Sequence, residues 1–183
     1  MDILVVVDMQ NDFVSGSLKS KDGDILLDRV VDKVNEFNGK IIYTLDTHGK
    51  DHLKTNEGKN LPIEHCIKGT EGHEIAKKLQ NTRSFKGAKK IEKNTFASVE
   101  LGKYLKELDE KENIDNIYFL GLVADICVVS NILMVKGFLP EKNIYLYKDL
   151  TEGLTDEKKQ SALDVLESVS YTHLRAHETP EHL

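Results

Sequence analysis

The sequence of 183 residues has few cysteines, no long apolar run and no basic cluster. Its two cysteines, Cys66 and Cys127, offer no disulfide framework, which indicates a reduced, cytoplasmic protein. The apolar runs are too short to cross a bilayer, and the apolar start at residues 3–7 lacks the basic lead of a signal peptide. Since the net charge is -6 and no basic cluster is present, we do not expect nucleic acid as the main partner, and the short apolar runs argue against a membrane.

The chain also lacks internal repeats, low-complexity linkers and a glycine-rich phosphate loop. Its length predicts a single domain with a sizeable core. The end of the chain differs from the rest, because residues 170–183 hold three of the seven histidines and show no apolar periodicity. We therefore predict one folded domain over residues 1–169, followed by a tail over residues 170–183 that does not look native to the fold.

Short β-branched runs alternate with amphipathic stretches through this domain. We expect strands near residues 3–7, 40–45, 89–92, 116–123 and 143–147, and helices near residues 25–37, 73–80, 98–109, after Cys127, and near 156–167. This alternation predicts an α/β fold with a doubly wound, Rossmann-like, mainly parallel sheet, helices on both faces and three α/β/α layers. Residues 46–72 read as a long irregular loop, and loops of that length are usually functional.

Three chemically capable residues follow predicted strands. Cys127 lies at a strand-to-helix junction, where free N–H groups and the helix dipole favour the reactive thiolate. Asp8 and Lys93 follow other strands at the same edge of the sheet, where catalytic side chains can converge. Each has a simpler interpretation: an inert core cysteine, a turn aspartate and a solvated lysine.

A second group of residues falls in and before the long loop. Asp46 and His48 are two residues apart after the second strand, so both can point into one cavity, and His65 comes later. Mixed carboxylate and imidazole ligands suit a divalent metal such as Zn, or alternatively Fe or Mn. The alternative is a polar loop with solvent-exposed histidines.

Three segments, taken together, resemble the isochorismatase-like cysteine hydrolase superfamily in its nicotinamidase-related branch. Residues 6–13 resemble the segment that carries the catalytic aspartate, residues 92–98 the lysine segment, and residues 121–128 the nucleophile segment. The similarity extends over about residues 1–168. Because the three motifs occur in the family's order, the resemblance is specific, whereas any one of them alone would not be.

The resemblance implies a hydrolase of small amides, first of all nicotinamide, that works through a thioester on Cys127 in pyridine nucleotide biosynthesis. Asp8 would be the general base, and Lys93 would hold the thiolate and Asp8 in one ion cluster. Backbone N–H groups of Val123 and Cys127 would form the oxyanion hole, with a cis bond before Val123. Phe13 would cover one face of the substrate ring.

The resemblance further implies a metal held by Asp46, His48 and His65, with His52 as a fourth candidate. Pro62 stands where some nicotinamidases have a ring-stacking aromatic residue. The alternatives left open are a vinyl-ether hydrolase of the isochorismatase type, another small-amide hydrolase and a non-catalytic binding protein. A homo-oligomer is compatible with the family. Because relatives end with one more strand, which the tail replaces, we expect residues 144–147 to form a partly exposed sheet edge.

Overall fold

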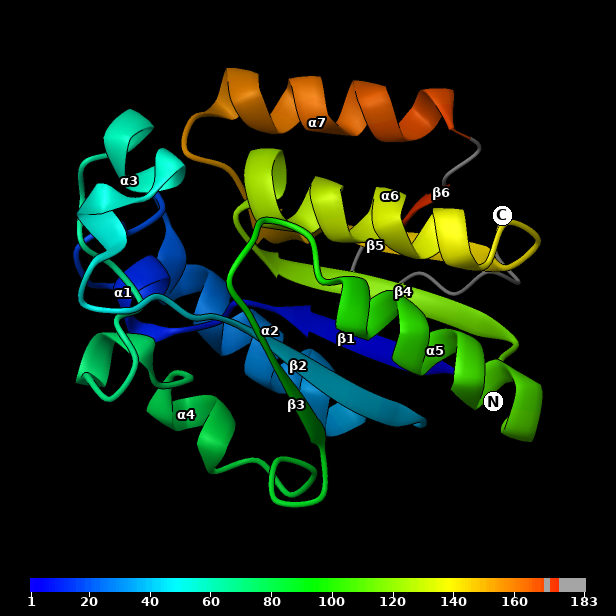
Figure 1. The fold of residues 1–183 in the computed structure, drawn as a ribbon. Helices are drawn as coiled ribbons and strands as arrows, with labels where there is room; N and C mark the ends of the chain where they lie inside the picture. Colours follow the sequence, from blue (N-terminus) through cyan, green and yellow to red (C-terminus); the bar gives the residue numbers. More distant parts are fainter. Residues whose placement is uncertain (170–171, 175–183) are drawn as a thin grey trace.

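The computed structural model describes residues 1–169 and 172–174 of the chain. Its centre is a parallel sheet of six strands in the order β3-β2-β1-β4-β5-β6 (Figure 1). The strands are β1 (Ile3–Val7), β2 (Lys40–Asp46), β3 (Lys89–Lys93), β4 (Asn116–Leu122), β5 (Asn143–Glu152) and β6 (Thr172–Leu174). The order reverses between β1 and β4, which is the switch point of a doubly wound sheet.

Helices cover both faces of the sheet and give the predicted three layers (Figure 1). One face carries α1 (Asn11–Val14), α2 (Gly23–Glu36) and α4 (Lys77–Gln80), and the other carries α5 (Val99–Glu112), α6 (Val129–Phe138) and α7 (Asp156–Ser168). The connections contain the short helical segments η1 (His52–Lys54), α3 (Asn56–Asn60), η2 (Glu71–His73) and η3 (Ala124–Val128). The predicted fold class is confirmed.

The strand β1 is buried on both faces, which explains its continuous apolar sequence. Leu4 and Val6 belong to the core beneath α2, whereas Ile3, Val5 and Val7 belong to the core beneath α5 and α6. Successive side chains of a strand point to opposite faces, so a central strand between two helical layers needs apolar residues at every position.

The strand register brings the carboxyl ends of four strands to one edge of the sheet. Asp46 pairs with Lys93 across β2 and β3, and Val7 pairs with both Thr44 and Gly121. Gly121 has a φ of +121°, and a Cβ at this position would lie 2.2 Å from the carbonyl oxygen of Val7. Only glycine therefore allows β4 to approach the end of β1 this closely.

The predicted exposed edge at residues 144–147 is wrong. The backbone of β6 pairs with Tyr145, Leu146 and Tyr147 of β5, so a sixth strand follows α7 after all. A strand of three residues is too short to show an apolar alternation, and backbone pairing does not depend on one. The rest of the predicted tail lies outside the described residues, and the domain boundary at residue 169 stays a prediction. Within residues 1–169 and 172–174, no helix combines the length and apolar character needed to cross a membrane.

Candidate active site and metal centre

The side chains of Asp8, Lys93 and Cys127 meet inside the protein at the carboxyl edge of the sheet. The Nζ atom of Lys93 lies 2.7 Å from Oδ2 of Asp8 and 3.5 Å from Sγ of Cys127. Asp8 follows β1, Lys93 ends β3, and Cys127 lies in η3 after β4. None of the three is more than 5% exposed. The structure therefore brings together the three residues that the sequence predicts as a catalytic group.

The backbone conformation of Asp8 and a hydrogen bond from Thr44 fix the position of its carboxylate. Its φ of 47° lies in the left-handed region, which aspartate tolerates better than most residues. The Thr44 hydroxyl donates a hydrogen bond of 2.6 Å to Oδ1. Burial raises the pKa of the Asp8 carboxyl and outweighs the opposing charge of Lys93. A carboxylate that binds a proton more readily than usual is suited to act as a general base.

Cys127 occupies a π-helical turn, in which the Val128 N–H donates to the carbonyl oxygen of Val123 at 3.1 Å. Such turns are rare and frequently lie at functional sites. Burial raises the pKa of the thiol well above its usual value, and the charge of Asp8 adds to this effect while Lys93 opposes it. Desolvation therefore opposes the effect of the helix start, which favours the thiolate.

Lys93 connects this group to the predicted metal ligands. Burial lowers the pKa of its amine, but the charges of Asp8, Cys127 and Asp46 outweigh this effect and raise the pKa well above its usual value. Its Nζ also lies 3.2 Å from Oδ1 of Asp46. A permanently charged ammonium therefore stands between two buried carboxylates and the thiol.

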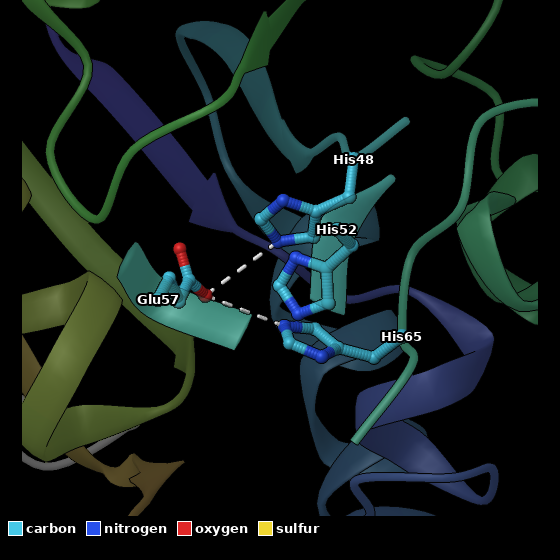
Figure 2. A group of neighbouring side chains, drawn as sticks. All are labelled: His48, His52, Glu57 and His65. Atoms are coloured by element: carbon cyan, nitrogen blue, oxygen red, sulfur yellow. Dashed lines mark ion pairs between the residues drawn. The ribbon is translucent and has the colours of Figure 1, made fainter. Parts of the chain in front are cut away.

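Four residues of the long loop gather beside Asp46 (Figure 2). Ligand atoms of His48, His52, Glu57 and His65 all lie within 4.8 Å of one another. Figure 2 shows the Glu57 carboxylate facing the imidazoles, and its Oε1 lies 3.6 Å from Nε2 of both His48 and His65.

Asp46 faces two of the same rings. Its Oδ2 lies 2.9 Å from Nε2 of His48 and 3.4 Å from Nε2 of His65. Burial raises the pKa of Asp46, but hydrogen bonds from His48 and His65 and the charge of Lys93 outweigh it, so the pKa falls well below its usual value. The structure therefore brings the three predicted metal ligands together.

The chemistry of this cluster fits a divalent metal. Both ring nitrogens of His52 are buried and lack a hydrogen-bond partner, which is costly for polar atoms without a ligand. Burial lowers the pKa of His65, yet hydrogen bonds to Asp46 and Glu57 outweigh it and raise that pKa to about 10. The two carboxylates thus favour positive charge here, and imidazole with carboxylate is a ligand set typical of Zn.

Two polar side chains fix the backbone around the candidate ligands Asp46 and Glu57. The Gln10 amide is fully buried, donates to the Asp46 carbonyl oxygen at 2.8 Å and accepts from the Asp46 N–H at 2.7 Å. The Thr55 hydroxyl accepts from the Gly58 N–H at 3.0 Å and caps α3, which carries Glu57. The loop is also tied to the end of β2, because the His48 N–H donates to the Cys66 carbonyl oxygen at 3.0 Å.

Sequence reasoning missed Glu57 and the supporting role of Gln10. Thr55, three residues before Gly58, is the signal that could have revealed the capped turn carrying Glu57. Gln10 shows no such signal, because its side-chain contacts with the backbone of Asp46 and His73 depend on the tertiary fold.

A cavity of about 440 Å³ adjoins the metal candidates. His48, His52 and Glu57 line one side, and residues 94–96, directly after Lys93, line the other. Phe96 is 45% exposed, so an aromatic ring is available at this wall. This size suits a small organic ligand.

The remaining predicted site residues lie nearby. Phe13 is 2% exposed, and its ring centre lies 5.6 Å from that of His65, so it packs behind a metal candidate. Its contact with a substrate stays a prediction. The peptide bond between Leu122 and Val123 is cis, as the family resemblance implies. The oxyanion role of Val123 and Cys127 also stays a prediction.

The protein is thus an α/β protein with a doubly wound sheet, and a buried thiol lies beside a lysine and an aspartate at the switch point of that sheet. Comparison with known proteins identifies the family within that class. Residues 2–177 match the Isochorismatase domain family, and the chain belongs to it.

The relatives are nicotinamidases and similar proteins. The nicotinamidase of Saccharomyces cerevisiae is 24% identical over 202 residues, which cover 86% of this chain and 90% of the relative. The structure of PnC1 from L. infantum in complex with nicotinate matches with a TM-score of 0.80 at 22% identity, over 96% of this chain and 93% of that chain. The structure of pyrazinamidase of Pyrococcus horikoshii in complex with zinc matches with a TM-score of 0.78 at 25% identity, over 95% of this chain and 98% of that chain. The predicted nicotinamidase-related branch is confirmed.

Proposed function

We propose that this protein hydrolyses nicotinamide to nicotinate and ammonia through a thioester on Cys127. The observation that carries the proposal is the buried contact of Lys93 Nζ with both Asp8 Oδ2, at 2.7 Å, and Cys127 Sγ, at 3.5 Å. The nicotinamidase relatives support the reaction type and the substrate.

The first half of the reaction uses Asp8 twice. Asp8 takes the proton of the Cys127 thiol, and the ammonium of Lys93 stabilises the resulting thiolate. The sulfur forms a bond to the amide carbon, and the C–N bond then breaks as Asp8 returns the proton to the leaving nitrogen. The products of this half are ammonia and a nicotinoyl thioester.

Water completes the reaction. Asp8 accepts a proton from the water that attacks the thioester carbon, the C–S bond breaks, and the proton returns to sulfur. In both halves the carbonyl oxygen gains negative charge. We assign its stabilisation to the backbone N–H groups of Val123 and Cys127, and one such donor typically contributes about 100-fold in rate.

We further propose that a divalent metal, Zn or alternatively Fe or Mn, is held by His48 and His65 together with Asp46, with His52 and Glu57 as additional ligands. The ion would act as a Lewis acid that orients the substrate ring beside the cavity. The convergence of imidazoles and carboxylates supports the site, and so does the zinc in the P. horikoshii relative.

The vinyl-ether alternative is less well supported, because that reaction needs no thiol, whereas Cys127 here contacts a buried ammonium.

We also propose that the reaction takes place in the cytoplasm, since both cysteines are free thiols in the structure. Cell fractionation with an antibody against the chain tests this location, and recovery outside the cytoplasm would refute it.

The test is ammonia release from nicotinamide by the metal-loaded protein. Cys127→Ala is expected to abolish release while the circular dichroism spectrum and melting temperature stay close to those of the wild type. Cys66→Ala is the matched control, because Cys66 is equally buried but lies outside the Asp8–Lys93–Cys127 group. Undiminished release by Cys127→Ala would refute the role of the thiol, and pyruvate release from isochorismate would favour the alternative.

A further inference from the structure

Asn131 lies on α6, four residues after Cys127, and is fully buried. Its Nδ2 donates to the carbonyl oxygen of Cys127 at 2.7 Å and to that of Phe96 at 3.1 Å. Its Oδ1 accepts from the Ser98 N–H at 2.9 Å. The amide thus uses three of its four hydrogen-bonding positions on the backbone of two separate segments.

These partners fix the orientation of the amide. Two of them are carbonyl oxygens, which only accept, and the third is an N–H group, which only donates. Turning the amide over would place oxygen against oxygen and nitrogen against N–H, so only one orientation satisfies all three contacts.

Helix formation does not explain an asparagine here. Asparagine is a weaker helix former than its neighbours leucine and methionine, and a buried amide is costly unless it is fully hydrogen-bonded. The other buried residues of α6, Ile132 and Val135, are apolar and serve the core. The three contacts of Asn131 are therefore the reason for its presence.

The two segments that Asn131 joins are both part of the site. One is the π-helical turn that carries Cys127, and the other is the stretch from Phe96 to Ser98, just beyond Lys93. Phe96 lines the cavity, and the Ser98 hydroxyl caps α5 by accepting from the Leu101 N–H at 3.0 Å. No strand pairing links these stretches, because β3 and β4 are separated in the sheet by β2 and β1.

We propose that Asn131 is a positioning residue, which aims the Cys127 thiol through its bond to the Cys127 carbonyl and holds the cavity wall at Phe96 against the same turn. The inference rests on the proposed role of Cys127 as nucleophile. Asn131 acts through the backbone and does not touch the reacting atoms. Small misplacements of a reacting group can cost about 100-fold in rate, so a hydrogen bond to the nucleophile's own peptide is an effective point of control.

Two variants of equal shape distinguish the effect of the bond to Cys127 from the effect of the bonds to Phe96 and Ser98. Asn131→Thr keeps a hydroxyl that can bond the carbonyl four residues earlier in a helix, as threonine commonly does, whereas Asn131→Val lacks it. Both variants lose the bonds to Phe96 and Ser98. We expect KM for nicotinamide to rise to a similar extent in both, whereas kcat falls about tenfold or more in Asn131→Val only.

A second readout does not need the substrate. The rate at which iodoacetamide alkylates Cys127, followed by peptide mass with Cys66 as internal reference, is expected to fall with kcat in Asn131→Val and to stay near the wild type in Asn131→Thr. If the wild type released no ammonia from nicotinamide while this alkylation pattern held, the proposed substrate would fail and the role of Asn131 would stand.

Thr82→Val provides the stability control, because the buried Thr82 hydroxyl donates to the Leu79 carbonyl oxygen at 2.7 Å, away from the site. It should lower the melting temperature and leave kcat unchanged. If Asn131→Val does not fold, Asn131→Asp replaces it, since a carboxylate oxygen then opposes the Cys127 carbonyl and should slow alkylation about tenfold. Equal kcat and equal alkylation rates in Asn131→Thr and in Asn131→Val, or in Asn131→Asp where that replaces it, would overturn the proposal.

Discussion

Replacing Asp8 by asparagine is the perturbation that separates charge from shape at the centre of the site. The asparagine side chain is isosteric, and its oxygen can turn toward Lys93 while its amino group faces the Thr44 hydroxyl, which either donates or accepts. The hydrogen bonds around residue 8 are therefore retained. What is lost is the negative charge next to Lys93 and the ability to take a proton.

The expected loss of activity follows from those two changes. General-base catalysis typically contributes about 100-fold to 10,000-fold, so kcat for ammonia release should fall by that factor, or about 3–5 kcal/mol. Breaking a buried ion pair costs about 3–5 kcal/mol of stability, but Lys93 keeps Asp46 at 3.2 Å as a partner. We therefore expect the variant to lose only about 2–3 kcal/mol and to remain folded.

The assay compares kcat, the free energy of unfolding in urea and the affinity for nicotinate by calorimetry. Nicotinate binding should change little, because Asp8 is fully buried and is not among the residues that line the cavity. Asp149→Asn serves as a charge control, since Asp149 pairs with Arg29 at 3.0 Å near the surface. A kcat within tenfold of the wild type in Asp8→Asn would refute the assignment of Asp8 as the base.

Three further outcomes are expected. Glu57→Gln should weaken metal binding about tenfold or more, measured in competition with a chelator. The control Glu64→Gln, at an exposed position beside His65, should leave the metal affinity unchanged. Equal metal affinities of the two variants would show that Glu57 is not a ligand. Chelation of a metal present at about 100 times its Kd should lower the free energy of unfolding by about 3 kcal/mol, and no change would speak against a bound ion. Gly121→Ala should lower the free energy of unfolding by about 3 kcal/mol or more, because its Cβ would lie 2.2 Å from the Val7 carbonyl oxygen. Gly137→Ala, with open space around its Cβ, should not destabilise the protein. Equal melting temperatures of the two variants would contradict the close approach of β4 to β1.

The sequence predicts the fold well because the sheet is buried on both faces. Continuous apolar runs such as that of β1 are conspicuous, and the ends of such strands locate Asp8 and Lys93 without knowledge of any contact. The family motifs supply the order of the three residues, and the comparisons confirm the family and agree with the predicted enzyme class.

Other features could not be predicted because they depend on tertiary contacts. Glu57 reaches the imidazoles only through the capped turn of α3, and Gln10 holds Asp46 only because β1 and β2 are paired. The raised pKa of Cys127 could not be predicted either, because local helix geometry favours the thiolate, whereas burial, which the sequence does not show directly, favours the thiol.

Trapping the covalent intermediate tests most directly whether Cys127 is the nucleophile. Metal-loaded protein is mixed with excess nicotinamide, quenched with acid during turnover, digested and analysed by peptide mass. A thioester on Cys127 predicts a nicotinoyl adduct on the peptide that carries Cys127, none on the peptide that carries Cys66, and none on either in Asp8→Asn. Ammonia release that continues in Cys127→Ala, or an adduct on Cys66 alone, would contradict it.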